Sequence, residues 1–205
     1  MVSQLHGAAG AGDLKAVKAL LKDGLYTEDQ DEFGLTPLMM AAERGHTRIV
    51  LTLLDHGSDI NARNRFGYTP LMLASVKGHC DVIRLLAARG ADIEARNSTG
   101  ESALNFTALV SGHPDSIDLL LDLGAEIETS SNGGYTPLIS AAERGHVEAV
   151  RHLLGRGAKA AAMTTAGETA FNKAAAIARR TQELGRTQEL DHCTIAMLLQ
   201  AAAND

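Results

Sequence analysis

The sequence predicts an all-α repeat solenoid, in which stacked helix–turn–helix units are joined by projecting hairpin loops. Three observations predict this class. Glycines recur at a fixed period, and a Thr–Pro pair opens several of the units. Two windows, GLTPLMMAAERGH (34–46) and GYTPLISAAERGH (134–146), start 100 positions apart and share ten of their thirteen letters. A fixed period of this kind is the signature of a repeat architecture.

Three glycine series have this period and stay in register along the chain. They are Gly34, Gly67, Gly100, Gly134 and Gly167; Gly12, Gly45, Gly78, Gly112 and Gly145; and Gly24, Gly57, Gly90, Gly124 and Gly157. Successive members are 33 residues apart except for one step of 34, and the extra residue falls in ESALNFTALVS (101–111).

The Thr–Pro pair predicts the first helix of a unit. In Thr36–Pro37, Thr69–Pro70 and Thr136–Pro137, the Thr side chain can cap the helix, and Pro fits its first position, where no amide hydrogen is needed. A short Ala-rich segment follows, as in LMMAAER (38–44). The second-series glycine ends the helix, because glycine adopts positive φ readily.

Apolar residues at helical spacing predict the second helix, as at Ile49, Val50, Leu53 and Leu54. This helix ends at the third-series glycine. The connecting segment, as in SDINARNRFG (58–67), is polar and turn-rich, so we expect it to project as an extended loop or hairpin. One unit has nothing to bury its apolar face against, so neighbouring units must stack.

At these residues the chain resembles the ankyrin-repeat family. The matching segments are GLTPLMMAAERGH with LLDHGSDINA (53–62), GYTPLMLASVKGH (67–79) with LLAARGADIEA (85–95), and GYTPLISAAERGH with LLGRGAKA (153–160). The resemblance implies a single ankyrin-repeat domain over 1–205. Its expected parts are an N-terminal capping repeat (1–30), four repeats (31–63, 64–96, 97–130 and 131–163) and an extended C-terminal capping repeat (164–205).

The chain departs from the family pattern in three places. Ser102–Ala103 stands where Thr–Pro is usual. The histidine of the family's TPLH motif is replaced by Met39, Met72 and Ile139, so apolar packing must order the helices at this position. In the last unit, IAMLLQAAA (195–203) arrives about a dozen residues late, and RTQEL occurs at both 180–184 and 186–190. We expect a lengthened helix pair, interrupted near Gly185, that caps the open end of the stack.

The sequence contains no GxGxxG, P-loop, GxSxG, HExxH or EF-hand motif. Four histidines each follow a glycine one unit apart: His46, His79, His113 and His146. Stacked helices lie roughly 8–10 Å apart, whereas zinc ligands lie within about 2.3 Å of one ion. We therefore expect no metal and no cofactor, and in the family this Gly–His pair is a structural signature between the two helices.

An enzyme with an unrecognised site near His192 and Cys193 is the alternative of another class. A general base must reach its proton in space, and no third, orienting group is apparent. Asp115, Asp118 and Asp122 fall on one helical face, which we interpret as solvated rather than as a weak cation site. We therefore expect that the protein is not an enzyme.

Composition bounds the partners and the compartment. The formal net charge of −6 argues against nucleic-acid binding, which usually shows a concentrated basic patch. No secretion signal and no apolar run of 18 residues are present, so no membrane association is expected. Cys80 and Cys193 are isolated, which favours a reducing compartment and a cytoplasmic location. The expected state in isolation is a monomer.

The charges are unevenly distributed. From Arg44 to Arg96 there are eight basic and five acidic residues, whereas Asn97 to Glu143 contains seven acidic residues and no Lys or Arg. Such polarity can orient a charged partner, or it can be a drift in solvating residues.

In the family, partners are gripped by the hairpin tips and by the first-helix surface on the concave side. The resemblance therefore implies a protein partner and these contact residues: Glu32, Phe33, Leu35, Arg65, Phe66, Tyr68 and Tyr135 at the tips, and Arg44, Lys77 and Arg144 on the first helices. Exposed aromatic residues near Arg are typical contact anchors, although packing against neighbouring hairpins is an alternative. The sequence thus predicts a non-catalytic protein–protein interaction module. An inhibitor or immunity-type protein, a host-targeted effector and a purely structural stack remain open.

Overall fold

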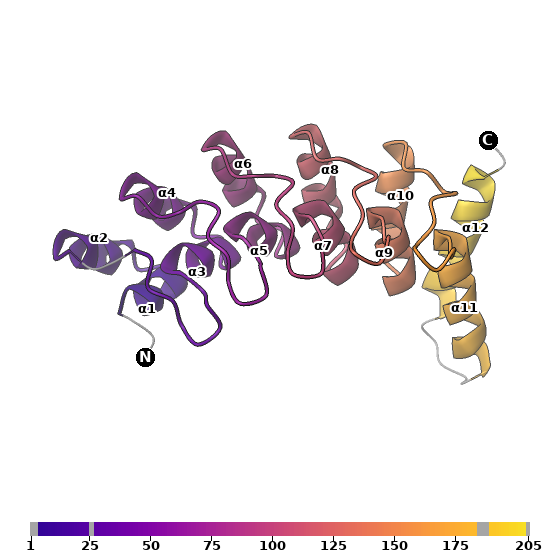
Figure 1. The fold of residues 1–205 in the computed structure, drawn as a ribbon, viewed down its shortest axis with the longest axis horizontal. Coiled ribbons are helices and arrows are strands. Elements are labelled where there is room, and N and C mark those ends of the chain that lie inside the picture. The colour runs from indigo at the N-terminus through magenta and orange to yellow at the C-terminus, as the bar shows by residue number, and fades with distance from the viewer. Residues whose placement is uncertain (1–3, 25–26, 184–188, 204–205) are drawn as a thin grey trace. The chain divides into compact units, whose positions relative to one another are not determined.

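The computed structural model describes residues 4–24, 27–183 and 189–203 (Figure 1). Within these ranges the chain forms twelve α-helices, and the only β-structure is an isolated antiparallel bridge between Met163 and Thr169. The predicted all-α repeat class is therefore confirmed. The chain divides into two compact units, Met1–Ser98 and Thr99–Asp205. The predicted repeat boundaries within 1–205 stay a prediction.

The first unit contains three helix pairs. They are α1 (Gln4–Ala11) with α2 (Leu14–Lys22), α3 (Pro37–Glu43) with α4 (Thr47–Asp55), and α5 (Pro70–Val76) with α6 (Cys80–Ala88). Helix α3 packs between α1 and α5, and α4 contacts both α2 and α6, so first helices form one layer and second helices another. Leu38, Met39, Ile49, Leu53 and Leu71 are fully or almost fully buried between these layers.

The second unit repeats this arrangement with a longer last pair. Its helices are α7 (Ala103–Val110) and α8 (Pro114–Asp122), α9 (Pro137–Arg144) and α10 (Val147–Gly155), and α11 (Ala170–Glu183) and α12 (Glu189–Ala202). Helix α9 packs between α7 and α11, while α10 contacts α8 and α12. Helices α11 and α12 have 14 residues each, against 8 or 9 in the two preceding pairs.

The helix boundaries form for the predicted local reasons. The Thr36 hydroxyl accepts the Met39 N–H at 3.3 Å, and Pro37 occupies the first turn of α3. At the other end, Gly45 has φ 75°, and the His46 N–H donates to the Ala41 carbonyl at 2.9 Å. A positive φ followed by such a bond ends a helix, because the left-handed residue turns the chain away from the helix axis.

The divergent repeat accommodates its extra residue in its first helix. Ser102 caps α7 by accepting the Asn105 N–H at 3.4 Å, so it replaces the usual Thr. Helix α7 has 8 residues where α3 and α5 have 7. Its end is closed by a 2.8 Å bond from the Gly112 N–H to the Thr107 carbonyl, five residues earlier. The wider turn absorbs the insertion without disturbing the start of α8.

The duplicated RTQEL segments fall in 180–190, and residues 184–188, which include the interruption expected near Gly185, lie outside the described residues.

Candidate functional site at the hairpin tips and first helices

The loop before each first helix has a backbone that is closed by its own hydrogen bonds. In the third repeat the Asn64 N–H donates to the Tyr68 carbonyl at 3.1 Å, and the Gly67 N–H donates to the Asn64 carbonyl at 2.9 Å. The Asn64 side-chain oxygen accepts the N–H groups of Phe66 and Tyr68. Asp31 accepts the N–H groups of Phe33 and Leu35 in the same way. These side-chain bonds hold each loop in a tight turn.

Successive tips are also bonded to each other. In the first unit the Arg65 N–H donates to the Phe33 carbonyl at 3.1 Å, and the Ser98 N–H donates to the Phe66 carbonyl at 3.0 Å. The tips approach so closely that a Cβ on Gly34 would lie 2.8 Å from the Arg65 nitrogen. Glycine is therefore required there for space as well as for its positive φ of 79°.

The predicted tip residues of the first unit include three aromatic side chains, Phe33, Phe66 and Tyr68. Phe33 and Phe66 are 52% and 53% exposed, which is high for large apolar side chains. The ring of Phe66 stacks on Tyr68, with centroids 5.8 Å apart. Arg65 directly precedes Phe66, and its backbone N–H bonds to the Phe33 carbonyl. Figure 1 shows the loops before α3 and α5 projecting on the same side of the first unit.

The remaining predicted tip residues differ in exposure. Glu32 and Arg65 are exposed, whereas Leu35 is half-buried. The Leu35 carbonyl accepts a hydrogen bond from His6 of α1 at 2.8 Å, so this position also holds neighbouring repeats together.

Arg44 and Lys77 lie at the opposite ends of α3 and α5 from the tips. Both are exposed C-cap residues, and the Lys77 ammonium is 3.4 Å from a Glu43 carboxylate oxygen. A hollow of about 400 Å³ opens here, lined by Glu43, Arg44, Lys77 and His79. Positive side chains are favourable at these helix ends, because the terminal carbonyls carry partial negative charge.

The corresponding residues of the second unit are partly occupied by internal contacts. Tyr135 is half-buried, and the Lys173 ammonium of α11 lies 5.1 Å from the centre of its ring. Lys173 also pairs with Glu168 at 2.7 Å and with Glu143 at 3.4 Å. The hydrogen bonds to Glu168 and Tyr135 raise the pKa of Lys173 above its usual value. Arg144, by contrast, is exposed.

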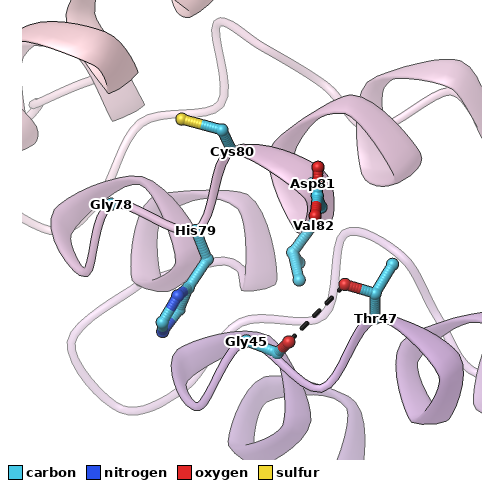
Figure 2. A pocket seen from close by; sticks show the side chains of 7 residues that line it. All are labelled: Gly45, Thr47, Gly78, His79, Cys80, Asp81 and Val82. Atoms are coloured by element: carbon cyan, nitrogen blue, oxygen red, sulfur yellow. Dashed lines mark hydrogen bonds between the residues drawn. The ribbon is translucent and has the colours of Figure 1, made fainter.

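The Gly–His pairs join neighbouring repeats. The His46 Nε2 donates to the Gly10 carbonyl at 3.2 Å, and the His79 Nε2 donates to the Glu43 carbonyl at 2.9 Å. Figure 2 shows a hollow of about 290 Å³ in which the His79 ring turns toward Gly45, while the Cys80 sulfur points to another side. The Thr47 hydroxyl, which also lines this hollow, donates to the Gly45 carbonyl at 3.5 Å. His113 is exposed and departs from this pattern.

Comparison with known proteins agrees with this geometry. A family model described as ankyrin repeats in three copies matches residues 5–97 and 90–164. The chain belongs to the ankyrin-repeat family. No match was found among curated proteins. Ankyrin repeats are generally protein–protein interaction modules and are typically non-catalytic.

The last ankyrin repeat restores its histidine at a residue that spacing did not indicate. His192 follows His146 by 46 residues rather than 33. Its Nε2 nevertheless donates to the Glu143 carbonyl at 3.2 Å, and a Cβ on Gly145 would lie 2.9 Å from its ring. His192 thus occupies the place that His79 occupies against Gly45. Cys193, the next residue in the chain, is exposed.

His146 is the most constrained member of this ankyrin histidine series. Its Nε2 is buried and has no hydrogen-bond partner within the described ranges. Burial lowers the pKa of His146 below its usual value, and the hydrogen bond with the Leu109 backbone acts in the opposite direction. The ring is therefore held in its neutral form.

His6 and Asn105 join neighbouring ankyrin repeats, and the sequence did not indicate this role for either residue. Both occupy the position of the histidine in the family's TPLH motif. Met39, Met72 and Ile139 are fully buried there, which confirms the predicted apolar packing. In the divergent repeat this position is Asn105, which donates to the carbonyls of Thr129 and Tyr135 at 3.1 and 2.7 Å and accepts the Ser140 hydroxyl at 3.1 Å. His6 plays the same part in the first repeat. The signal that could have identified Asn105 is its place three residues after the capping residue Ser102.

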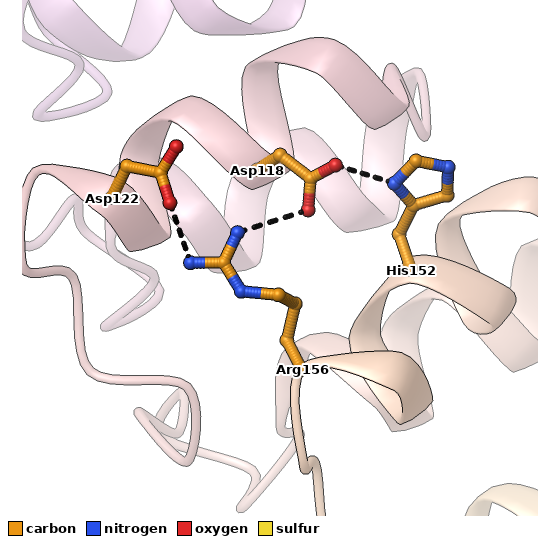
Figure 3. A network of polar contacts seen from close by, with 4 residues as sticks. All are labelled: Asp118, Asp122, His152 and Arg156. Atoms are coloured by element: carbon orange, nitrogen blue, oxygen red, sulfur yellow. Dashed lines mark hydrogen bonds and ion pairs between the residues drawn. The ribbon is translucent and has the colours of Figure 1, made fainter.

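Two of the three carboxylates of α8, Asp118 and Asp122, form an ion-pair network (Figure 3), whereas Asp115 is exposed. Asp118 accepts a hydrogen bond from His152 Nδ1 at 2.6 Å and lies 3.3 Å from Arg156 Nη1; Arg156 Nη2 lies 2.7 Å from Asp122. The Asp118 side chain is only one-third exposed, so the interpretation as solvated residues is wrong for it. The Asp55–Arg89 pair, at 3.0 Å, has the same 34-residue spacing as Asp122–Arg156.

Within the described residues no group of three or more His, Cys, Asp or Glu side chains is arranged to hold a metal ion. No helix among them is both long enough and apolar enough to cross a membrane.

Proposed function

We propose that the protein binds a protein partner through its hairpin tips and the concave surface of its first helices. The observation that carries this proposal is the pair of half-exposed rings, Phe33 and Phe66, on tips whose backbones are fixed by hydrogen bonds. A large apolar ring in water is unfavourable, and such rings gain free energy when a partner covers them. We further propose that the protein acts as a monomer in the cytoplasm.

The tips serve as supports for side chains rather than as sites of chemistry. Each tip is braced by its neighbour, as in the bond from the Arg65 N–H to the Phe33 carbonyl, so the main chains that carry the two rings are held together. His46, His79 and His192 bond to backbone carbonyls and so link repeats. The family supports the same conclusion, since ankyrin repeats generally bind proteins.

A site-specific cross-linker tests this proposal. A photoreactive phenylalanine at position 66 should form a discrete adduct with a protein of the cell that makes this chain. The same group at Arg84, an exposed residue of α6, serves as the control and should form no such adduct. An excess of unlabelled protein should compete, whereas the Phe66→Ala, Tyr68→Ala variant should compete at least about tenfold less well.

Circular dichroism and thermal unfolding would first establish that the double variant is folded. The proposal fails if this folded variant competes as well as the unaltered protein, or if positions 66 and 84 give the same adducts.

A further inference from the structure

We infer that the partner presents an acidic segment with an apolar side chain, and that this segment binds to the first unit and not to the equivalent surface of the second. This inference rests on the proposed function and specifies the chemistry of the partner. The surface, which we call the first-unit face, consists of Phe33, Arg44, Arg65, Phe66, Tyr68 and Lys77.

The apolar part of the first-unit face is at the tips. Phe33 and Phe66 occupy equivalent positions in consecutive repeats, and both are about half exposed. Tyr68 extends the surface by stacking on Phe66. The Arg65 side chain passes close to Gly34, since its Cγ would be 3.2 Å from a Cβ there, so its stem lies beside the residue that follows Phe33. An aliphatic or aromatic side chain of the partner fits against such a surface.

The cationic part begins at Arg65 and continues at the far ends of α3 and α5. Helix α3, which separates the hollow beside Arg44 and Lys77 from the tip loop, has seven residues and is therefore about 10 Å long. Glu43 also lines this hollow, but its carboxylate is 3.4 Å from Lys77, whereas Arg44 is exposed. Arg65 at the tips and Arg44 with Lys77 at the far helix ends therefore place positive charge at both ends of the face, against the exposed carboxylate of Glu32 beside Phe33. Carboxylates of a partner complement this positive charge.

The equivalent positions of the second unit lack these properties. The tip positions of Phe33 and Phe66 are taken there by Thr99 and Gly133, and that of Arg65 by Asn132. Tyr135, at the position of Tyr68, is half-buried as Tyr68 is, but Lys173 lies over its ring.

The net charge of the first unit is also less negative than that of the second. Residues 1–98 contain 11 basic and 12 acidic residues, while residues 99–205 contain 8 and 13. The segment from Arg44 to Arg96 has three more basic than acidic residues. An acidic partner is therefore attracted to the part of the first unit that carries Phe66 and repelled by the second unit.

Peptide selection on the full chain tests the inference directly. A phage-displayed library of random 16-residue peptides would be selected on the immobilised protein, and selected peptides measured by fluorescence anisotropy at 50 and 300 mM salt. We expect peptides with net negative charge and at least one aliphatic or aromatic residue. Binding should weaken at least about tenfold at the higher salt, because the opposite charges are screened.

The chain provides a matched pair of variants. Arg44 and Arg144 both lie in the segment AAERGH, one in each unit, and both are exposed. Arg44→Glu should weaken binding at least about tenfold, whereas Arg144→Glu should change it less than about twofold. Similarly, Phe66→Ala with Tyr68→Ala should weaken binding, and Tyr135→Ala should not.

Several results would overturn the inference. They are selection of basic or uncharged peptides, an equal loss in Arg44→Glu and Arg144→Glu, a selection that yields no binding peptide, and preferential binding of a 16-nucleotide single-stranded DNA to the same face. If Arg44→Glu has no effect while position 66 still cross-links to a protein, the acidic partner is wrong and the proposed function stands. If the tip variants leave cross-linking unchanged, the proposed function itself is wrong.

Discussion

At the scale of single residues, the contacts between repeats depend on a few buried polar side chains. Asn105 is completely buried, and its side chain makes three hydrogen bonds: one to the Thr129 carbonyl at the end of its own repeat and two to Tyr135 and Ser140 of the following repeat. Without Asn105, the buried Thr129 carbonyl would lose this donor, and the Tyr135 carbonyl would keep only the Ser131 N–H. Leaving a buried polar group without its partner costs more than the bond itself contributes.

Asn105→Ala should therefore destabilise the protein clearly. We expect the free energy of unfolding to fall by about 2–4 kcal/mol, measured by urea unfolding followed by circular dichroism. Asn172 occupies the same repeat position in α11 but is exposed, so Asn172→Ala should change this free energy by less than about 0.5 kcal/mol. Equal effects of the two substitutions would contradict the role assigned to Asn105.

His146 should make stability depend on pH. Its pKa is lowered in the folded protein because the ring is buried, so the unfolded chain binds the proton more strongly. The unfolded state is then favoured as pH falls through the unfolded value, about 6.5. The melting temperature of the wild type should drop between pH 7.5 and 5.5 by more than that of His146→Gln.

The exposed His56 provides the control for this experiment, since His56→Gln should keep the wild-type pH dependence. Parallel melting curves for the wild type and His146→Gln over this pH range would show that burial of His146 does not govern the effect.

At the scale of elements, α11 and α12 show how an irregular repeat keeps its place in the stack. Helix α11 contacts α9 and α12, and α12 also reaches α9 and α10. The anchor is His192, which bonds to the Glu143 carbonyl as His79 bonds to that of Glu43. Lengthening both helices moved this histidine 13 residues along the sequence without changing its contact.

His192→Ala should loosen α12 from α9. We expect the free energy of unfolding to fall by about 1–3 kcal/mol, because the Glu143 carbonyl loses its donor and the space against Gly145 empties. Cys193→Ser alters the exposed neighbour and should change the free energy by less than about 0.5 kcal/mol. Should His192→Ala be neutral in urea unfolding, the residue would not be the anchor of α12.

The first helices could be predicted because their causes are local. Thr36 and Gly45 act within one helix, by a cap and by a left-handed turn, and both are legible in the sequence. His192 could not be recognised by the same signal, because Asp191 replaces the usual glycine and the period is broken. Its role depends on which carbonyl the folded chain brings to it, and periodicity carries no such information.

At the scale of the whole molecule, the chain consists of two compact units, each with its own layers of first and second helices. In repeat proteins each repeat contacts only its neighbours, so a local weakness opens part of the array before the rest. Polar links between repeats occur in both units, with His6 in the first and with Asn105 and the Lys173 cluster in the second, so loss of Asn105 should weaken the second unit first.

Hydrogen exchange should reveal this unequal stability. In the Asn105→Ala variant under native conditions, we expect amides of α7 and α9 to exchange at least about tenfold faster than in the wild type, and those of α3 and α4 less than about twofold faster. Mass spectrometry of proteolytic fragments resolves the two regions. Uniform acceleration in all four helices would indicate a single cooperative unit instead.

The position of the candidate surface could be predicted from the family pattern, but its extent could not. Exposure of Phe33, Phe66 and Arg65 follows from their place at the tips. Tyr135 has the same place in its repeat, and only the packing of α11 brings Lys173 onto its ring. Contacts between residues distant in sequence therefore decide which tip residues remain available.

The hydrogen bonds between tips have a consequence for the kinetics of binding. A flexible loop loses conformational entropy when a partner orders it, and this loss is subtracted from the affinity. Here Asn64 and the bond from Arg65 to Phe33 have already ordered the main chain. A partner needs to restrict only side chains such as Phe66, at about 0.5–1.5 kcal/mol each. Association therefore requires no slow loop rearrangement, and exchanging one tip side chain for another changes chiefly how long the complex lasts.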